Sequence, residues 1–121
     1  MPPPALAWRS APAALAAEAA VASRVSLVGR TREATEEVAK RYGIGHVATD
    51  LSESLARSDV DAVILATPTQ MHASQAIACL AAGKHVQVEI PLADSLKDAE
   101  AVHAAQKASG RVAMVGHTRR F

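Results

Sequence analysis

The stretch that decides the fold runs from Asp59 to Phe121 and reads DVDAVILATPTQMHASQAIACLAAGKHVQVEIPLADSLKDAEAVHAAQKASGRVAMVGHTRRF. Three short apolar runs alternate in it with two segments of helical pattern. The runs are Ala62–Ala66, Val86–Val88 and Val112–Val115, and the helical segments are Gln70–Ala82 and Ser95–Ser109. Strict alternation of strand and helix predicts an α/β fold with parallel strands and crossover helices. The runs are apolar throughout, which is typical of strands covered on both faces.

The same alternation continues upstream of Asp59 in shorter elements. A strand, a helix, a second strand and a short helix are predicted in turn, over Val25–Gly29, Thr31–Tyr42, Gly45–Thr49 and Leu51–Arg57. Two pairs of residues resemble capping boxes that begin helices, namely Asp50 with Glu53 and Ser95 with Asp98. The helical spacing places two apolar sets toward the core: Ala73, Ala76, Ile77 and Leu80, and then Leu96, Ala99 and Val102.

Length and composition restrict the class of protein. A chain of 121 residues is one domain or part of one, and its formal charge of +1 gives no sign of a nucleic-acid or membrane partner. No apolar run approaches the roughly 18 residues that span a bilayer, so a cytoplasmic protein is expected. The single cysteine, Cys79, excludes an intramolecular disulfide and is expected to be small and buried. The scattered histidines lack ligand spacing, so no metal site is predicted.

Residues 1–24 differ in composition from the rest of the chain. They are rich in Ala and Pro, contain no glycine and carry a single acid. Ser10 and Pro12 are suited to the start of a helix that runs through Ala22, and Pro4–Trp8 is a candidate for a first strand. The segment lacks the basic cluster of a signal peptide, and an organelle transit segment is a weaker alternative.

Polar residues gather where three of the predicted strands end. In parallel sheets, ligands bind beyond the carboxyl ends of the strands. The residues predicted at that edge are Thr67-Pro68-Thr69, Glu89-Ile90-Pro91 and Gly116-His117, and His72 follows in the first turn of a helix. A carboxylate at Glu89 could accept hydrogen bonds from ribose hydroxyls or a nicotinamide amide. The competing interpretations are a locally hydrogen-bonded His72 and an exposed acid at a strand end.

Two basic segments flank this edge. Arg30 and Arg32 follow the first clear strand, where a dinucleotide domain contacts the adenosine ribose. An acid there favours NAD and an arginine pairs with the 2′-phosphate of NADP, so the sequence leans toward NADP. His117 could exchange protons near neutral pH, and Arg119 and Arg120 could hold substrate carboxylates. The alternatives are a solvated helix start for the first segment and a basic surface turn for the second.

The absence of a glycine-rich turn is the main objection to a dinucleotide site. The chain has no G-x-G-x-x-G, the turn that usually holds a pyrophosphate at a helix N-terminus. Its place would be just before Val25. Either the chain does not bind a dinucleotide, or residues 1–24 are not the authentic start of the fold. The first strand is normally central in the order 3-2-1-4-5-6, so its loss would leave unpaired edges on the Val25 and Ala62 strands.

Together these motifs resemble a known family. DVDAVILATPTQMH (59–72), GKHVQVEIPLA (83–93) and VAMVGHTRRF (112–121) are similar to the nucleotide-binding half of the Gfo/Idh/MocA oxidoreductases. That family has a TP-x-x-x-H turn, an E-K-P loop and a G-x-x-x-R-F ending at these places. The resemblance implies a partial Rossmann-type, doubly wound parallel sheet in which the first strand and glycine-rich loop are absent or degenerate. Residues 1–24 are then an atypical segment, 25–121 a partial dinucleotide-binding domain, and the substrate domain is missing.

The resemblance also implies roles for individual residues. The resemblance implies contacts with NADP or NAD at three places. Arg30, Thr31 and Arg32 would contact the adenosine phosphate, and Thr67, Pro68 and Thr69 would lie along the dinucleotide. Glu89 would lie near the nicotinamide ribose, and His72 would support the turn. The chain departs from the family at Ile90, where most members have a lysine. Isoleucine cannot move a proton, so His117 is the candidate base. Arg119 and Arg120 are the candidate substrate ligands.

A closer resemblance narrows the activity. VQVEIPLAD (86–94) and MVGHTRRF (114–121) are most similar to family members of protocatechuate degradation. This implies NAD(P)-dependent oxidation of a carboxy-hydroxymuconate semialdehyde hemiacetal to a lactone, by a full-length homo-oligomer. The chain by itself looks like a fragment and is expected to be inactive. A non-catalytic nucleotide-binding or interaction module is the alternative, favoured by Ile90 and the missing glycine loop. A truncated, non-functional product is a third possibility.

Overall fold

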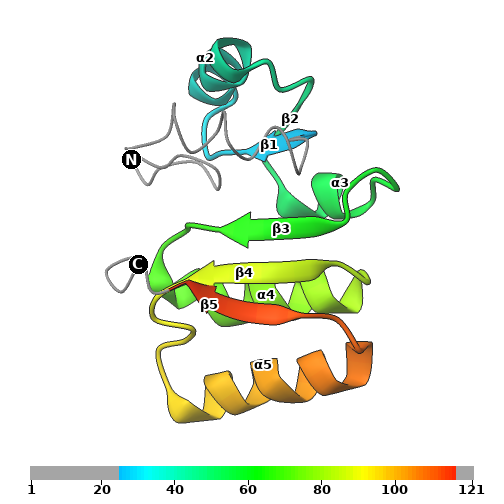
Figure 1. Cartoon of the computed structure of the whole chain (residues 1–121). Coiled ribbons are helices and arrows are strands. Elements are labelled where there is room, and N and C mark those ends of the chain that lie inside the picture. The colour runs from blue at the N-terminus through cyan, green and yellow to red at the C-terminus, as the bar shows by residue number, and fades with distance from the viewer. Residues whose placement is uncertain (1–24, 117–121) are drawn as a thin grey trace.

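A computed structural model describes residues 25–116, in which strands and helices alternate as the sequence predicts (Figure 1). The elements are β1 (Ser26–Val28), α2 (Arg32–Tyr42), β2 (His46–Ala48), α3 (Leu51–Leu55), β3 (Ala62–Leu65), α4 (Thr69–Ala81), β4 (His85–Glu89), α5 (Leu96–Ser109) and β5 (Ala113–Gly116). All the strand pairs in this part of the chain are parallel. The predicted α/β class with crossover helices is therefore confirmed.

The strands form two sheets rather than one. β1 pairs with β2, and β3, β4 and β5 pair in that order. Within residues 25–116 no strand pairing joins β1 to β3, although the two sheets lie next to each other (Figure 1). In a complete doubly wound sheet one further strand stands between the two that correspond to β1 and β3. The unpaired edges expected on these two strands are present.

The larger core belongs to the three-stranded sheet. Its buried residues come from β3, β4, α4 and α5: Leu65, Ala76, Cys79, Leu80, Val86, Val88 and Val102. Ala73 and Ile77 of α4 pack against this set, as the helical spacing predicts. Since α4 and α5 contribute to the same cluster, both helices cover the same face of the sheet.

The smaller core belongs to the two-stranded sheet. Its buried residues are Leu27, Ala39 and Ile44, so it lies between β1 and α2. The residue before Leu27 points the other way, because Ser26 bonds to Ser54 of α3. Leu51 and Leu55 of α3 in turn pack against the larger core. α2 therefore lies on one side of the sheets, and α3, α4 and α5 lie on the other.

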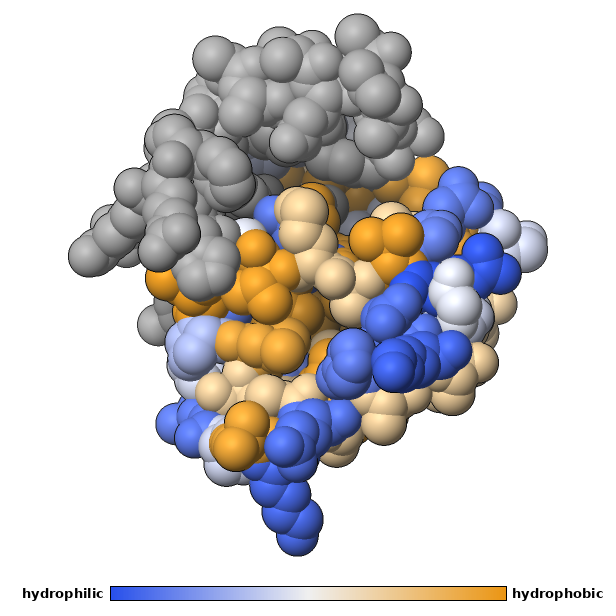
Figure 2. Space-filling view, turned by 60° about the horizontal axis from the view of Figure 1, so that its bottom comes forward, coloured by the Kyte–Doolittle hydropathy of each residue, from blue (hydrophilic) through white to orange (hydrophobic). Residues whose placement is uncertain are grey.

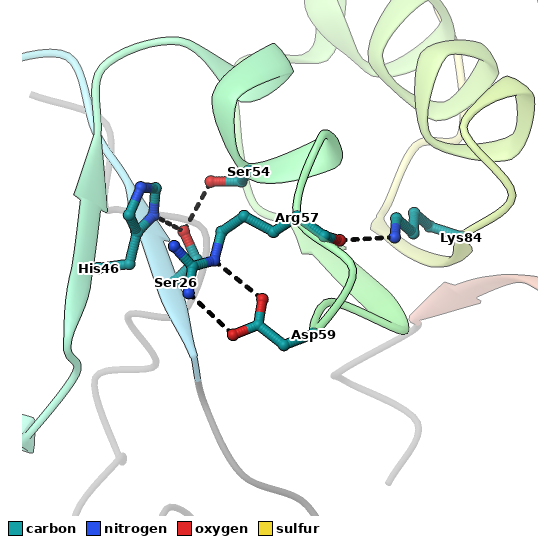
Figure 3. A network of polar contacts seen from close by, with 6 residues as sticks. All are labelled: Ser26, His46, Ser54, Arg57, Asp59 and Lys84. Carbon is teal, nitrogen blue, oxygen red and sulfur yellow. Dashed lines mark hydrogen bonds and ion pairs between the residues drawn. The ribbon is translucent and has the colours of Figure 1, made fainter.

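Polar contacts around α3 connect the two sheets (Figure 3). The Ser26 hydroxyl lies 2.6 Å from the Ser54 hydroxyl and 2.8 Å from Nδ1 of His46. Just after α3, the carbonyl of Arg57 accepts a hydrogen bond of 2.9 Å from Nζ of Lys84, which precedes β4. These contacts gather at the amino ends of the strands. Residues of α3 and of the turn after it therefore connect the two sheets, which in a continuous sheet would be joined by strand pairing.

The helix starts differ in detail from the predictions. Ser95 caps α5 by accepting from the amide of Asp98 at 3.1 Å, as predicted. At the start of α3, the Asp50 side chain accepts a hydrogen bond of 2.9 Å from the amide of Ser52. The predicted capping box of Asp50 with Glu53 is therefore not formed. The prediction that Leu96 faces the core is wrong. This side chain is 76% exposed, because it lies in the first turn of α5, where the helix has not yet reached the sheet.

Candidate functional site at the carboxyl ends of the strands

The predicted site residues that the structure describes lie at one edge of the sheets. Thr67 comes two residues after β3, and Glu89 is the last residue of β4. Glu89 is in register with Gly116, the last residue of β5. Gly29 follows β1 in the same way. The carboxyl ends of the strands therefore bring these segments to the same edge, as expected for a ligand site in such a fold.

His72 joins two of these segments. Its side chain is only 1% exposed, and its two ring nitrogens contact two backbone carbonyls from different loops. Nε2 lies 2.7 Å from the carbonyl oxygen of Thr67, and Nδ1 lies 2.7 Å from that of Pro91. The ring thus holds the turn after β3 against the loop after β4. A side chain buried in this way positions the walls of the site and does not line its surface.

The turn after β3 is further fixed by side-chain contacts. The Thr67 hydroxyl donates to Oε1 of Gln75 over 2.6 Å, which holds the turn against the next stretch of α4. Pro68 is the N-cap of α4, and Thr69 is the first residue of the helix. No side-chain hydrogen bond caps this helix, so its first turn faces the site with backbone amide groups.

The segment after β1 is open and basic. Arg30, Thr31 and Arg32 are all exposed, and Arg32 makes only a long contact with Glu36, 3.9 Å between Nη1 and Oε1. Thr31 occupies the N-cap position of α2, and its side chain makes no capping hydrogen bond. An exposed pair of arginines at a helix start can contact a phosphate group from solvent without first losing a buried partner.

Gly29 is required by the packing of this segment. A Cβ atom added at Gly29 would overlap the side-chain oxygen of Thr35. Thr35 is buried, and its hydroxyl donates to the carbonyl of Thr31 over 2.6 Å, so it cannot move aside easily. No acidic side chain fits at Gly29 in this structure. This contact could not be predicted, because nothing in a Gly and a Thr six positions apart indicates that they touch.

The loop after β4 presents an apolar residue where a lysine is usual. Ile90 is 38% exposed, and its peptide bond with Pro91 is cis. Glu89, beside it, is half-buried. On the neighbouring strand a Cβ at Gly116 would come within 2.8 Å of Nε2 of Gln87, which is the flexible end of that side chain and can move aside. Gln75, which accepts from Thr67, is a contributor that sequence patterns did not identify.

Three of the predicted site residues, His117, Arg119 and Arg120, lie outside the described residues. The carboxylate of Asp59 has a lowered pKa, because it accepts two hydrogen bonds from the Arg57 guanidinium, of 2.9 Å and 2.8 Å. That ion pair (Figure 3) lies between α3 and β3, before the amino end of β3, whereas the candidate site is at the carboxyl ends of the strands.

Cys79 is buried in the larger core, as predicted. Burial raises the pKa of its thiol to about 12, so it is not a nucleophile at neutral pH. No helix within residues 25–116 is both long and apolar enough to cross a membrane.

Comparison with known proteins shows the family to which this chain belongs. The model of the oxidoreductase family with an NAD-binding Rossmann fold, Gfo/Idh/MocA, matches residues 8–117. The chain belongs to this family. Membership confirms the resemblance inferred from the three strand-end motifs. It also agrees with a nicotinamide dinucleotide as the class of cofactor, without deciding between NAD and NADP.

Individual relatives refine the comparison. The 4-carboxy-2-hydroxymuconate-6-semialdehyde dehydrogenase of Sphingobium sp. is 68% identical over 97 residues, which are 80% of this chain and 31% of that enzyme. This confirms the closer resemblance predicted from VQVEIPLAD and MVGHTRRF. The 1,5-anhydro-D-fructose reductase of Ensifer adhaerens is 37% identical over 93 residues, 77% of this chain and 28% of its own length. The chain therefore spans about a third or less of these relatives.

A solved structure shows the same fold with a cofactor bound. The WlbA dehydrogenase of Chromobacterium violaceum, in complex with NADH and UDP-GlcNAcA, superposes with a TM-score of 0.83 at 30% identity. The match covers 89% of this chain and 31% of that one. The levoglucosan dehydrogenase complex with NADH superposes with a TM-score of 0.72 at 34% identity, over 76% of this chain and 25% of its own.

Proposed function

We propose that this chain is the cofactor-binding part of an NAD(P)-dependent dehydrogenase that oxidises a carboxy-hydroxymuconate semialdehyde, in its cyclic hemiacetal form, to a lactone. The observation that carries the proposal is the 68% identity to the Sphingobium dehydrogenase over 97 residues. The reaction moves a hydride from the hemiacetal carbon to the nicotinamide ring and the hydroxyl proton to a base. The carbon becomes the lactone carbonyl, and one dinucleotide is reduced for each substrate oxidised.

Each of the two sheets contributes residues that contact one half of the dinucleotide. The basic segment Arg30–Arg32 after β1 contacts the adenosine half. The turn Thr67–Thr69 and the end of β4 at Glu89 contact the nicotinamide half. His72 fixes the distance between the second and third of these segments through its two carbonyl contacts. The cofactor supplies the redox chemistry, and these residues orient it.

We propose NADP as the preferred cofactor. NAD-specific sites place an acid at the end of the strand before this segment, where it accepts from the ribose 2′-hydroxyl. The contact between Gly29 and Thr35 leaves no room for such a side chain. Arg30 and Arg32 are exposed and can pair with a 2′-phosphate. Both features favour the phosphorylated cofactor.

The base is proposed to be His117, because Ile90 occupies the usual position of the lysine and cannot exchange a proton. Arg119 and Arg120 are proposed to hold substrate carboxylates. Since the match covers only 31% of the Sphingobium enzyme, the rest of the substrate site is proposed to lie in a further domain. The complete protein is proposed to be a cytoplasmic homo-oligomer, and the 121-residue chain alone is not expected to turn over substrate.

A chimaera tests the activity directly. The 97 matching residues of the Sphingobium enzyme are replaced by those of this chain, and reduction of NADP and of NAD is followed by absorbance with the semialdehyde. The proposal expects turnover, with a higher kcat/KM for NADP. The matched control replaces His117 in the chimaera by Gln, which should lower kcat by on the order of a hundredfold or more, because the general base is lost.

The alternative function is a binding module that holds a dinucleotide without turnover. Ile90 is the observation that favours it. A chimaera that binds NADP but reduces neither cofactor would establish this alternative and contradict the dehydrogenase proposal.

A further inference from the structure

We infer that Thr35 sets the choice between NADP and NAD without touching the cofactor, because its side chain keeps residue 29 a glycine and so excludes the acid that NAD-specific sites have there. The inference rests on the proposed function and deepens it, since it takes the dinucleotide to contact the segment after β1. Thr35 is 1% exposed and is therefore a positioning residue that acts through Gly29.

The segment 29–32 is the place in the described chain where the two cofactors can be told apart. NADP and NAD differ only at the 2′-position of the adenosine ribose, which carries a phosphate in one and a hydroxyl in the other, and charged or polar groups must read that difference. Figure 2 shows apolar surface gathered across the middle of one face of the described part of the chain, and such surface cannot make the distinction. Among the described segments that follow a strand at the carboxyl edge, 29–32 is the one that contains arginine.

Gly29 is not required by the conformation of the backbone. Gly43, Gly83 and Gly110 have positive φ, which favours glycine, whereas Gly29 does not. The amide of Gly29 donates to the carbonyl of Ala48 over 3.1 Å, which continues the pairing of β1 with β2. Other residues could adopt this extended backbone, so the space around the missing side chain is what excludes them.

The side chain of Thr35 fills that space. A Cβ at Gly29 would overlap Oγ1 of Thr35 and would lie 3.2 Å from both Cβ and Cγ2 of the same residue. Oγ1 is held in place, because it donates to the carbonyl oxygen of Thr31 over 2.6 Å and a β-branched side chain has few rotamers in a helix. The main obstacle to a side chain at residue 29 is therefore one hydroxyl oxygen.

This hydroxyl is not needed to satisfy its partner. The carbonyl of Thr31 also accepts from the backbone amide of Thr35, over 3.0 Å, and this bond remains when the side chain is shortened. Thr35→Ala therefore removes the overlap without leaving a buried acceptor unpaired. The remaining contact of 3.2 Å between the two Cβ atoms requires a shift of only a few tenths of an ångström.

An acid at residue 29 would reverse the preference of the segment. Its carboxylate would accept from a 2′-hydroxyl and repel a 2′-phosphate. It would also stand next to Arg30, whose guanidinium is otherwise exposed and open to a phosphate. By excluding the acid, Thr35 leaves the arginines to decide the selectivity.

A double-mutant cycle in the 121-residue chain tests the inference. The variants are Gly29→Asp, Thr35→Ala and the two together, and Gly29→Asp/Thr35→Ser is the matched control because serine keeps Oγ1. Two quantities are measured for each variant. They are the urea midpoint of unfolding without cofactor, and the dissociation constants of NADP and NAD by isothermal titration calorimetry.

Gly29→Asp should lower the urea midpoint, and adding Thr35→Ala should restore most of the loss, whereas adding Thr35→Ser should not. The affinity ratio of NADP to NAD should fall by on the order of a hundredfold between the native chain and Gly29→Asp/Thr35→Ala, because a charged contact with the 2′-phosphate is lost and a hydrogen bond to the 2′-hydroxyl is gained. Thr35→Ala alone should still prefer NADP, since it adds no acid.

Two results would overturn the inference. One is a Gly29→Asp variant with the native midpoint and the same cofactor ratio as Gly29→Asp/Thr35→Ala, because Thr35 would then exclude nothing. The other is equal midpoints and cofactor ratios for the double variants with alanine and with serine, because Oγ1 would then not be the obstacle. A native chain that binds NAD as tightly as NADP, with the midpoints in the expected order, would contradict the proposed cofactor preference while confirming that Thr35 excludes the acid.

Discussion

The two halves of the molecule are built from the same alternation of strand and helix but differ in how well they are held together. Among the described residues, the half with β3, β4, β5, α4 and α5 has seven buried residues in its cluster, and the half with β1, β2 and α2 has three. Burial of apolar surface is the main source of stability, so the first half should be much the more stable. A shared pattern of elements therefore does not imply a shared stability.

The division also separates functions. The basic segment Arg30–Arg32 belongs to the smaller half, and the turn at Thr67 and the strand end at Glu89 belong to the larger half. His72 makes the larger half's part of the site rigid, whereas the arginines of the smaller half are exposed. A dinucleotide that contacts both would itself help to fix the halves relative to each other.

The largest expected effect comes from the larger core. Leu80→Ala should lower the free energy of unfolding by about 3 kcal/mol, because Leu80 is 1% exposed and its removal leaves a cavity. Ile44→Ala in the smaller core should destabilise mainly β1, β2 and α2 in deuterium exchange. Leu96→Ala is the matched control, since that leucine is 76% exposed and its loss should change stability by less than about 0.5 kcal/mol. Equal urea midpoints for Leu80→Ala and Leu96→Ala would contradict the assignment of the core.

The next effect concerns the histidine that joins two loops. His72→Ala should destabilise the chain by about 2 kcal/mol, because the buried carbonyls of Thr67 and Pro91 lose their contacts with the ring. Exchange should rise in the turn after β3 and in the loop after β4, and not in α2. His103→Ala, on the exposed side of α5, serves as the control and should be neutral. If the two variants unfold alike, His72 does not hold the loops together.

The smallest effect tests the connection around α3. Ser26→Ala should cost about 1 kcal/mol, because the hydroxyls of Ser26 and Ser54 no longer contact each other. The loss should appear as faster exchange in β1 and β2 with β4 unchanged, measured against Ser58→Ala, an exposed serine in the next loop. Faster exchange in β4 to the same degree would mean that the halves unfold as one unit.

The order of elements could be predicted because each apolar run and helix start carries a local signal. Ser95 caps α5 as its spacing with Asp98 indicates, and Ala76 and Leu80 reach the core by simple helical periodicity. Leu96 fits the same periodicity but lies beyond the sheet, which no local pattern reveals. Periodicity describes the face of a helix and not where along its length the neighbouring layer begins.

Within the site, contacts between distant residues were the least predictable. His72 reaches the carbonyl of Pro91, nineteen residues away, and nothing in the sequence indicates which carbonyl it meets. The contact of Thr35 with Gly29 depends on how closely α2 approaches the end of β1. The site residues themselves could be proposed because strand ends mark the ligand edge in this class of fold.

The central claim is that one dinucleotide contacts both halves of the chain. The most direct test is a titration of the isotope-labelled 121-residue chain with NADP and, separately, with NAD, followed by backbone amide shifts. Both cofactors should shift the amide signals of Thr67 and Glu89, and NADP should shift those of Arg30 to Arg32 more strongly than NAD does. Shifts confined to one half, or none with either cofactor at millimolar concentration, would contradict it.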